Sequence, residues 1–181
     1  MIASPVEDLK RWCGLAWTVF WRLESVWRSP TLSLPTKLRL FDSLVICIMF
    51  YASEAWPVNV EMTKLINSFA TSAYRVMTGV RRLDRVHNNT VLASVSRREL
   101  IYTLQSRQLR FLGHLLRSER ALYAPYEPQH GSTRRDRPRT NFISYIQKLT
   151  GQQLAELTDL SQDRDAWRQL VVEGVDLQPP D

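Results

Sequence analysis

Cysteine and histidine are scarce in this 181-residue sequence. The two cysteines, Cys13 and Cys47, lie within apolar helical patterns and have neither zinc-site spacing nor the pattern of a disulfide framework. The three histidines, His87, His114 and His130, are scattered, with no cysteine or carboxylate at ligand spacing. We therefore expect a protein of a reducing compartment that binds no metal.

The motifs of nucleotide and ester chemistry are also missing. Only six glycines occur, and they form neither a phosphate-binding loop nor a nucleophile elbow. Two-metal nucleotidyl transfer needs clustered carboxylates on rigid elements. The pair Asp163 and Asp165 lies at a predicted helix start, where the helix dipole favours acidic side chains. We expect a non-catalytic chain with no cofactor and no small-molecule substrate.

Long hydrophobic runs are absent as well. The most apolar run, residues 44–52, is too short to cross a bilayer and predicts a buried central helix. Glu7, Asp8 and Lys10 interrupt any apolar signal-peptide core near the N-terminus. We expect an intracellular protein, nuclear or cytoplasmic, with no membrane contact.

What the sequence does contain is helical periodicity. Apolar residues recur with a period of about 3.6 along most of the chain, and no segment shows the period of two typical of a strand. We predict an all-α helical bundle of four to five helices, with a basic loop and a small C-terminal helical extension. The helices expected in its first part cover residues 6–27, 33–54, 59–77 and 89–95, followed by one starting near residue 96.

Four segments follow from this pattern. We expect the bundle over residues 1–118, a basic flexible linker over 119–139, a short C-terminal helical segment over 140–173 and a frayed tail over 174–181. The apolar content of 44% and the charged content of 23% are typical of a globular protein.

The most informative stretch is residues 96–139. Ser96 and Glu99 have the spacing of a capping box before an apolar run, so we predict that a helix starts there. One face of this helix is apolar. The opposite face carries the residues that we call the basic ribbon: Arg107, Arg110, His114 and Arg117. An arginine cluster follows in the linker: Arg134, Arg135, Arg137 and Arg139.

The charge of this stretch sets it apart. Residues 97–139 contain ten arginines, no lysine and four acidic residues, so they carry the whole net charge of +6. Arginine forms planar bidentate contacts with phosphate, and a row of arginines suits a repeating polyanion. We therefore predict contact with RNA, DNA or their hybrid through the basic ribbon and the arginine cluster. The alternative is a soluble amphipathic helix whose outer face is basic without a partner.

A second face, on the first helix, combines aromatic and basic residues. Lys10, Trp17, Trp21 and Arg28 share one side of the predicted helix, and we call them the aromatic face. Tryptophans flanked by cations can stack on bases while the charges hold phosphate. The alternative is that Trp17 and Trp21 dock against a neighbouring helix or another domain.

Several stretches together resemble one family. They are GLAWTVFWRLESVWRS from Gly14, KLRLFDSLVICIMFYASEAW from Lys37, NSFATSAYRVMTGVRRLDRV from Asn67, RQLRFLGHLLRS from Arg107, the arginine cluster and DRDAWRQLV from Asp163. In this order they are similar to the region downstream of the polymerase core in reverse transcriptases of non-LTR (LINE-type) retrotransposons. The resemblance covers nearly the whole chain.

The resemblance implies a thumb, that is, a helical bundle that grips template and primer, followed by a nucleic-acid-contacting segment. It would place the basic ribbon on the nucleic-acid face and make the arginine cluster a flexible clamp. The family's aspartate-pair motif, palm, fingers and endonuclease domain are not in this sequence. The family's arginine-proline segment is richer in glycine and is followed by tryptophan, whereas Asp136 and Phe142 stand at comparable places here.

The expected function is therefore that of a non-catalytic fragment of a LINE-type reverse transcriptase that binds RNA or DNA backbone without sequence specificity. A palm domain or another protein is a further expected partner. The alternative is a helical protein-interaction module, from a domesticated or decayed element, that docks through the aromatic face.

Overall fold

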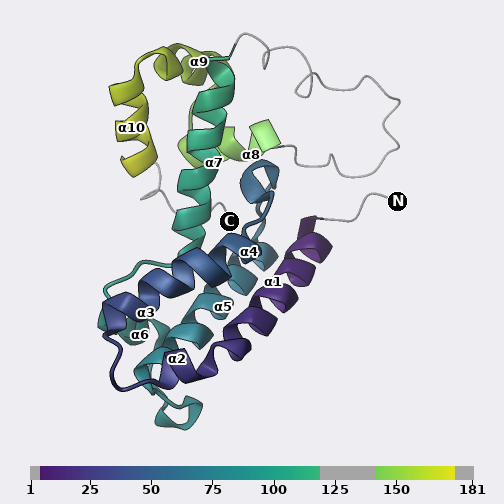
Figure 1. Cartoon of the computed structure of the whole chain (residues 1–181). Coiled ribbons are helices and arrows are strands. Elements are labelled where there is room, and N and C mark those ends of the chain that lie inside the picture. The colour runs from purple at the N-terminus through teal and green to yellow at the C-terminus, as the bar shows by residue number, and fades with distance from the viewer. Residues whose placement is uncertain (1–4, 119–141, 174–181) are drawn as a thin grey trace. The chain divides into compact units, whose positions relative to one another are not determined.

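The computed structural model describes residues 5–118 and 142–173. In these ranges the backbone forms helices, turns and bends and no β-strand (Figure 1). The predicted all-α class is thus confirmed for this part of the chain. The helices are shorter and more numerous than expected, because breaks divide several predicted helices. None of the described helices is both long enough and apolar enough to cross a bilayer.

The chain divides into two compact units. Unit 1 comprises Met1–Ser53 and Asn59–Thr103, and unit 2 comprises Glu54–Val58 and Leu104–Asp181. The division falls inside helix α7 (Leu100–Leu116), whereas we expected the bundle to continue to residue 118. Each unit has its own buried core.

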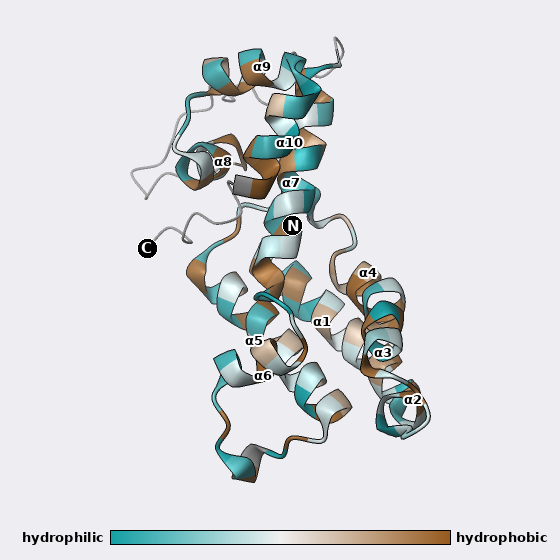
Figure 2. Cartoon of the chain, turned by 90° about the vertical axis from the view of Figure 1, so that its left-hand side faces the viewer, coloured by the Kyte–Doolittle hydropathy of each residue, from teal (hydrophilic) through white to brown (hydrophobic). Residues whose placement is uncertain are grey.

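Unit 1 is built around helix α5. Its helical elements before α7 are α1 (Pro5–Arg22), α2 (Glu24–Arg28), α3 (Leu34–Phe41), the π-helix η1 (Asp42–Ile46), α4 (Cys47–Met49), α5 (Val60–Thr78), the 3-10 helix η3 (Arg82–Asp84) and α6 (Asn88–Ser94). Helix α5 contacts α1, α2, α3 and α6. Figure 2 shows apolar and polar colours alternating along these helices, as expected for helices with one buried and one exposed face.

The predicted first helix over residues 6–27 is broken near Leu23, where the backbone leaves the helical region (φ −102°, ψ 21°). The break lets Trp27 fold back, so that its indole Nε1 donates to the Phe20 carbonyl at 2.7 Å. The Phe20 and Trp27 rings stack with their centroids 5.2 Å apart. A carbonyl at the end of α1 thereby finds a partner inside the core.

Aromatic rings fill the core of unit 1. Phe41 lies 6.1 Å from Phe20, 6.2 Å from Phe69 and 5.6 Å from Tyr74, measured between ring centroids. All four side chains are at most 4% exposed. Burial raises the pKa of Tyr74 to about 12, because the phenolate would be poorly solvated there.

The prediction that residues 44–52 form the central buried helix is wrong. This stretch divides into η1, α4 and a turn, and Leu44 and Tyr51 are 41% and 61% exposed. The central helix is α5 instead, since it buries residues along its whole length: Met62, Ile66, Phe69, Ala70, Thr71, Ala73, Tyr74 and Met77.

Local caps form where side chain and backbone lie close in sequence. The Ser33 side chain accepts a hydrogen bond from the Thr36 amide at the start of α3. Asn59 accepts from the Met62 amide at the start of α5. Gly79 ends α5 in the left-handed conformation (φ +73°), which glycine adopts without strain.

The predicted capping box at Ser96 and Glu99 is wrong. Ser96 has a left-handed backbone (φ +51°) and ends α6, where its amide and that of Arg97 donate back to the Ala93 and Leu92 carbonyls in a Schellman pattern. The cap of α7 comes from α5. The Asn67 Oδ1 atom accepts from the Ile101 amide at 3.1 Å, and Asn67 Nδ2 donates to Glu99 Oε2 at 2.7 Å.

Unit 2 joins the larger part of α7 to three short helices, which are α8 (Phe142–Thr150), α9 (Leu154–Gln162) and α10 (Arg164–Glu173). Leu104, Leu109 and Leu112 of α7 are buried, as are Ile146 of α8 and Leu157 of α9. The unit therefore has an apolar core of its own. The segment Glu54–Val58 joins it through Trp56, whose carbonyl accepts from Gln108 Nε2 at 2.8 Å.

Candidate nucleic-acid interface

The basic ribbon lies within unit 2, and its four members have different surroundings. Arg110 and His114 are exposed, whereas Arg107 and Arg117 are half-buried. The structure thus leaves two of the four predicted residues exposed to solvent.

Arg107 is engaged with an acid. Its Nη2 atom forms an ion pair with Glu54 Oε1, and the two side chains are 36% and 27% exposed. The Glu54 carboxylate balances the guanidinium charge, so less of that charge is available to an external phosphate. Arg107 ties the segment Glu54–Val58 to α7.

Arg110, His114 and Arg117 line a hollow of about 420 Å³ together with Arg164, Trp167 and Arg168 from α10. We call it the α7–α10 hollow. Among the described residues, five of its six lining side chains are basic and none is acidic. Two helices thus present their basic faces to the same space, which concentrates positive potential.

Trp167 fixes how α10 packs on α7. Its side chain is 3% exposed, and its indole Nε1 donates to the Leu109 carbonyl at 3.1 Å. The indole lies against Gly113, where a Cβ atom would overlap the ring. A glycine on α7 is therefore what lets the two basic helices approach closely.

The start of α10 has a separate support. Asp163 Oδ1 accepts hydrogen bonds from the amides of Asp165 at 2.8 Å and of Ala166 at 3.2 Å. This confirms the predicted capping role of this acidic pair at the helix start, with Asp163 as the cap. Asp165 also forms an ion pair with Arg168 at 2.5 Å. Over the described ranges, no group of three or more histidine, cysteine, aspartate or glutamate side chains could hold a metal ion.

Arg117 is oriented by the backbone. Its Nη1 atom donates to the Ser161 carbonyl at 3.1 Å, at the end of α9. That carbonyl lies in the last turn of α9, where cationic donors are favoured. Arg117 therefore contributes charge to the hollow from a fixed position.

Sequence reasoning missed Arg164 and Arg168. Their spacing of four residues puts them on one face of α10, and this signal was present in the sequence. The sequence indicated capping acids and one piece of the family resemblance in this stretch, but no partner for the basic ribbon. The contact between Gly113 and Trp167 decides that α10 packs on α7. The sequence pattern alone did not reveal this contact.

The residues of the aromatic face, on α1 and α2 of unit 1, differ in their exposure to solvent. Trp17 is half-buried and lies 4.5 Å from Phe69 between ring centroids, so it packs on the neighbouring helix α5. Trp21 stacks on Trp17 at 6.0 Å and remains 47% exposed.

The two cations of this face have acidic partners. Lys10 pairs with Glu61 at 2.9 Å, and Arg28 pairs with Glu24 at 2.7 Å. These pairs are exposed and therefore weak. The geometry favours docking on a neighbouring helix for Trp17 and leaves Trp21 as the accessible ring.

The arginine cluster, Arg134, Arg135, Arg137 and Arg139, lies outside the described residues. Its predicted contact with nucleic acid stays a prediction.

Comparison of the chain with known protein families, curated proteins and solved structures gives no match.

Proposed function

We propose that unit 2 binds the sugar-phosphate backbone of RNA, DNA or their hybrid, without sequence specificity, in the α7–α10 hollow. The observation that carries this proposal is the set of five basic side chains, from two helices, around one hollow that no acid from residues 5–118 or 142–173 lines. Backbone phosphates are the repeating anions that such a surface fits.

The composition of the hollow favours phosphate contact over base recognition. The side chains of Arg110 and Arg164 are exposed and have no ion pair or hydrogen bond to another described residue. Trp167 is buried and hydrogen-bonded, so its ring is not available for stacking on a base. A basic surface that offers no ring for base stacking binds the sugar-phosphate backbone and has little preference for sequence.

The same proposal places the chain in a larger protein. An all-α chain with this order of motifs fits the thumb-like bundle and downstream segment of a LINE-type reverse transcriptase. The chain would then be non-catalytic by itself, with a palm domain as its natural partner. A primer-extension assay with this chain alone should yield no product, and any nucleotide incorporation would overturn this part of the proposal.

The binding proposal is tested by salt dependence. Fluorescence anisotropy with a short labelled duplex, repeated at several salt concentrations, gives the slope of log affinity against log salt. The variant Arg110→Gln/Arg164→Gln should lower that slope by up to about two units, because each lost phosphate contact removes roughly one. The matched control is Arg39→Gln, an exposed arginine of α3 outside the hollow. Equal slopes for the double variant and the control would refute the proposal.

A second candidate, a helical protein-interaction module, is favoured by exposed apolar side chains on unit 1. Leu15 and Trp21 on α1 are each 47% exposed, and Tyr51 is 61% exposed. Size-exclusion chromatography with light scattering distinguishes the two candidates. Association that persists in high salt and disappears in Trp21→Ala would favour the interaction module.

A further inference from the structure

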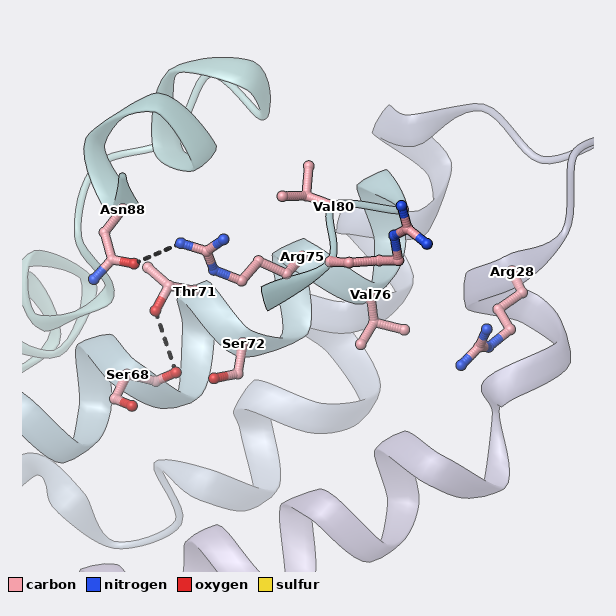
Figure 3. Close-up of a pocket in the computed structure, with 10 residues that line it drawn as sticks. Arg28, Ser68, Thr71, Ser72, Arg75, Val76, Val80 and Asn88 are labelled. Atoms are coloured by element: carbon pink, nitrogen blue, oxygen red, sulfur yellow. Dashed lines mark hydrogen bonds between the residues drawn. The ribbon is translucent and has the colours of Figure 1, made fainter. Parts of the chain in front are cut away.

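We propose that unit 1 binds a phosphate group at a second site, beside α5, that is separate from the α7–α10 hollow. The site is a hollow of about 600 Å³ lined by Arg28, Ser68, Thr71, Ser72, Arg75, Val76, Gly79, Val80, Arg81 and Asn88 (Figure 3). In the described part of the chain, its lining contains three arginines, three hydroxyl groups and no acidic side chain. We call it the α5 hollow.

One exposed stripe of α5 forms the floor of this hollow. Ser68, Ser72, Arg75 and Gly79 follow one another at spacings of four, three and four residues, so they share one face of the helix. Ser68 and Ser72 are exposed, and among the described residues neither hydroxyl has a hydrogen-bond partner. A serine hydroxyl can donate to an anionic oxygen. The floor therefore offers two donors that the fold itself does not use.

Arg75 is held in place at the side of the hollow. Its Nη2 atom donates to the Val86 carbonyl at 2.6 Å and to Asn88 Oδ1 at 3.0 Å, and Figure 3 shows the side chain extended toward Asn88. The N–H groups on Nε and Nη1 have no acceptor in the described part of the chain. A guanidinium that is already oriented loses little entropy when it binds an anion.

Arg28 and Arg81 approach the same hollow from other elements. Arg28 ends α2, and Arg81 follows the left-handed turn at Gly79. Both pair with acids outside the lining through Nε, Arg28 with Glu24 at 2.7 Å and Arg81 with Asp84 at 3.6 Å. Such exposed pairs are weak. The terminal guanidinium nitrogens of both arginines can still turn to a phosphate.

These donors favour phosphate over other anions. Guanidinium groups bind phosphate oxygens with two parallel hydrogen bonds, and hydroxyl donors occupy the oxygens that remain. The volume of about 600 Å³ lies within the ~300–1,000 Å³ typical of small-ligand sites. The phosphate could be the terminal monoester of a nucleic-acid strand or an internal diester, and the experiment below distinguishes the two.

The first test uses inorganic phosphate as the probe and the full chain as the protein. Two-dimensional ¹H–¹⁵N NMR should show saturable shifts at the amides of Ser72, Gly79 and Asn88. Ser72→Asp places a negative charge in the hollow, which repels the phosphate anion, and should weaken phosphate binding by about tenfold or more. Ser72→Ala, the matched control at the same exposed position, should weaken it by less than about threefold because only one neutral donor is lost.

The second test uses two short single strands of deoxythymidine, one with a 5′-phosphate and one with a 5′-hydroxyl. Tighter binding of the phosphorylated strand that disappears in Ser72→Asp identifies the terminal monoester as the ligand. Equal binding of both strands, weakened in Ser72→Asp, identifies the internal diester. The Arg110→Gln/Arg164→Gln variant should leave the inorganic-phosphate shifts in unit 1 unchanged, so the two sites can fail independently. An absence of saturable shifts at these amides, or shifts unaffected by Ser72→Asp, overturns the proposal.

Discussion

The Trp167 indole lies against Gly113 at a point where any side chain on α7 would overlap the ring. This contact lets α10 approach α7 closely enough for Arg164 and Arg168 to line the same hollow as the basic ribbon. The packing of α10 on α7 and the proposed binding of nucleic acid in unit 2 thus both depend on Gly113.

Gly113→Ala should destabilise the protein by about 1–3 kcal/mol, because the added methyl group forces the indole out of a close-packed position. Chemical denaturation followed by tryptophan fluorescence measures this change. The control is Gly14→Ala on α1, where an added Cβ atom has no neighbour within 4 Å. That variant should be neutral or stabilising by up to about 1 kcal/mol, since alanine is the better helix former. Equal effects at both positions would contradict the assigned packing.

Asn67→Ala should cost about 0.5–2 kcal/mol of stability, because the start of α7 loses its cap. By contrast, Ser96→Gly should stabilise the protein by roughly 1 kcal/mol, since Ser96 has a left-handed backbone that glycine adopts without strain. Thermal unfolding of both variants checks these signs. Destabilisation by Ser96→Gly would instead indicate that Ser96 caps α7 in the predicted capping box.

Arg107 should behave as a structural residue more than as a phosphate contact. A double-mutant cycle of Arg107→Gln and Glu54→Gln should give a coupling free energy on the order of 1 kcal/mol, because the pair is partly shielded from water. The more exposed pair of Lys10 and Glu61 should give less than about 0.5 kcal/mol.

In the salt titration, Arg107→Gln should change the slope of log affinity against log salt less than Arg110→Gln does. Arg110 is exposed and lines the hollow, whereas the charge of Arg107 is already balanced. A larger slope change for Arg107→Gln would show that its ion pair opens for nucleic acid.

The two cysteines should differ in reactivity. Burial raises the pKa of Cys13 to about 11, so only roughly 0.1% of this thiol is thiolate at pH 8. Cys47 is exposed and should react first with a chromogenic disulfide reagent. The rate at Cys13 should rise about tenfold per pH unit until the pH approaches its pKa, because the thiolate is the reactive form.

The cysteine variants identify each phase. Cys47→Ser should remove the fast phase at pH 8, and Cys13→Ser should leave it in place. Loss of the fast phase in Cys13→Ser instead would contradict the burial of that thiol.

Signals that act within a few residues were readable from the sequence. Helices start close to the predicted residues 33 and 59, where Ser33 and Asn59 cap them, and Asp163 caps the helix start at which the acidic pair was expected. Each depends on a side chain and a backbone group that the chain itself keeps close. The capping box at Ser96 failed because the same residue types can serve either end of a helix, and a distant asparagine took the role.

Burial of the most apolar run could not be judged from hydropathy alone. Residues 44–52 are more hydrophobic than α5, yet Leu44 and Tyr51 are exposed. A helix becomes central when several neighbours pack on it, and α5 has contacts with α1, α2, α3 and α6. The number of neighbours depends on how the helices pack. The apolar composition of a helix predicts that packing only in part.

The sequence by itself determined the all-α class, most helix positions and the strong basic bias of residues 97–139, because helical period and charge are properties of neighbouring residues. Only the tertiary structure decided which cations act together. It joined Arg110 and His114 to Arg164 and Arg168 across more than forty residues, and it paired Arg107 with Glu54. The reason is physical: the electrostatic free energy of a charge depends on distances in space, and packing of side chains such as Trp167 on Gly113 sets those distances.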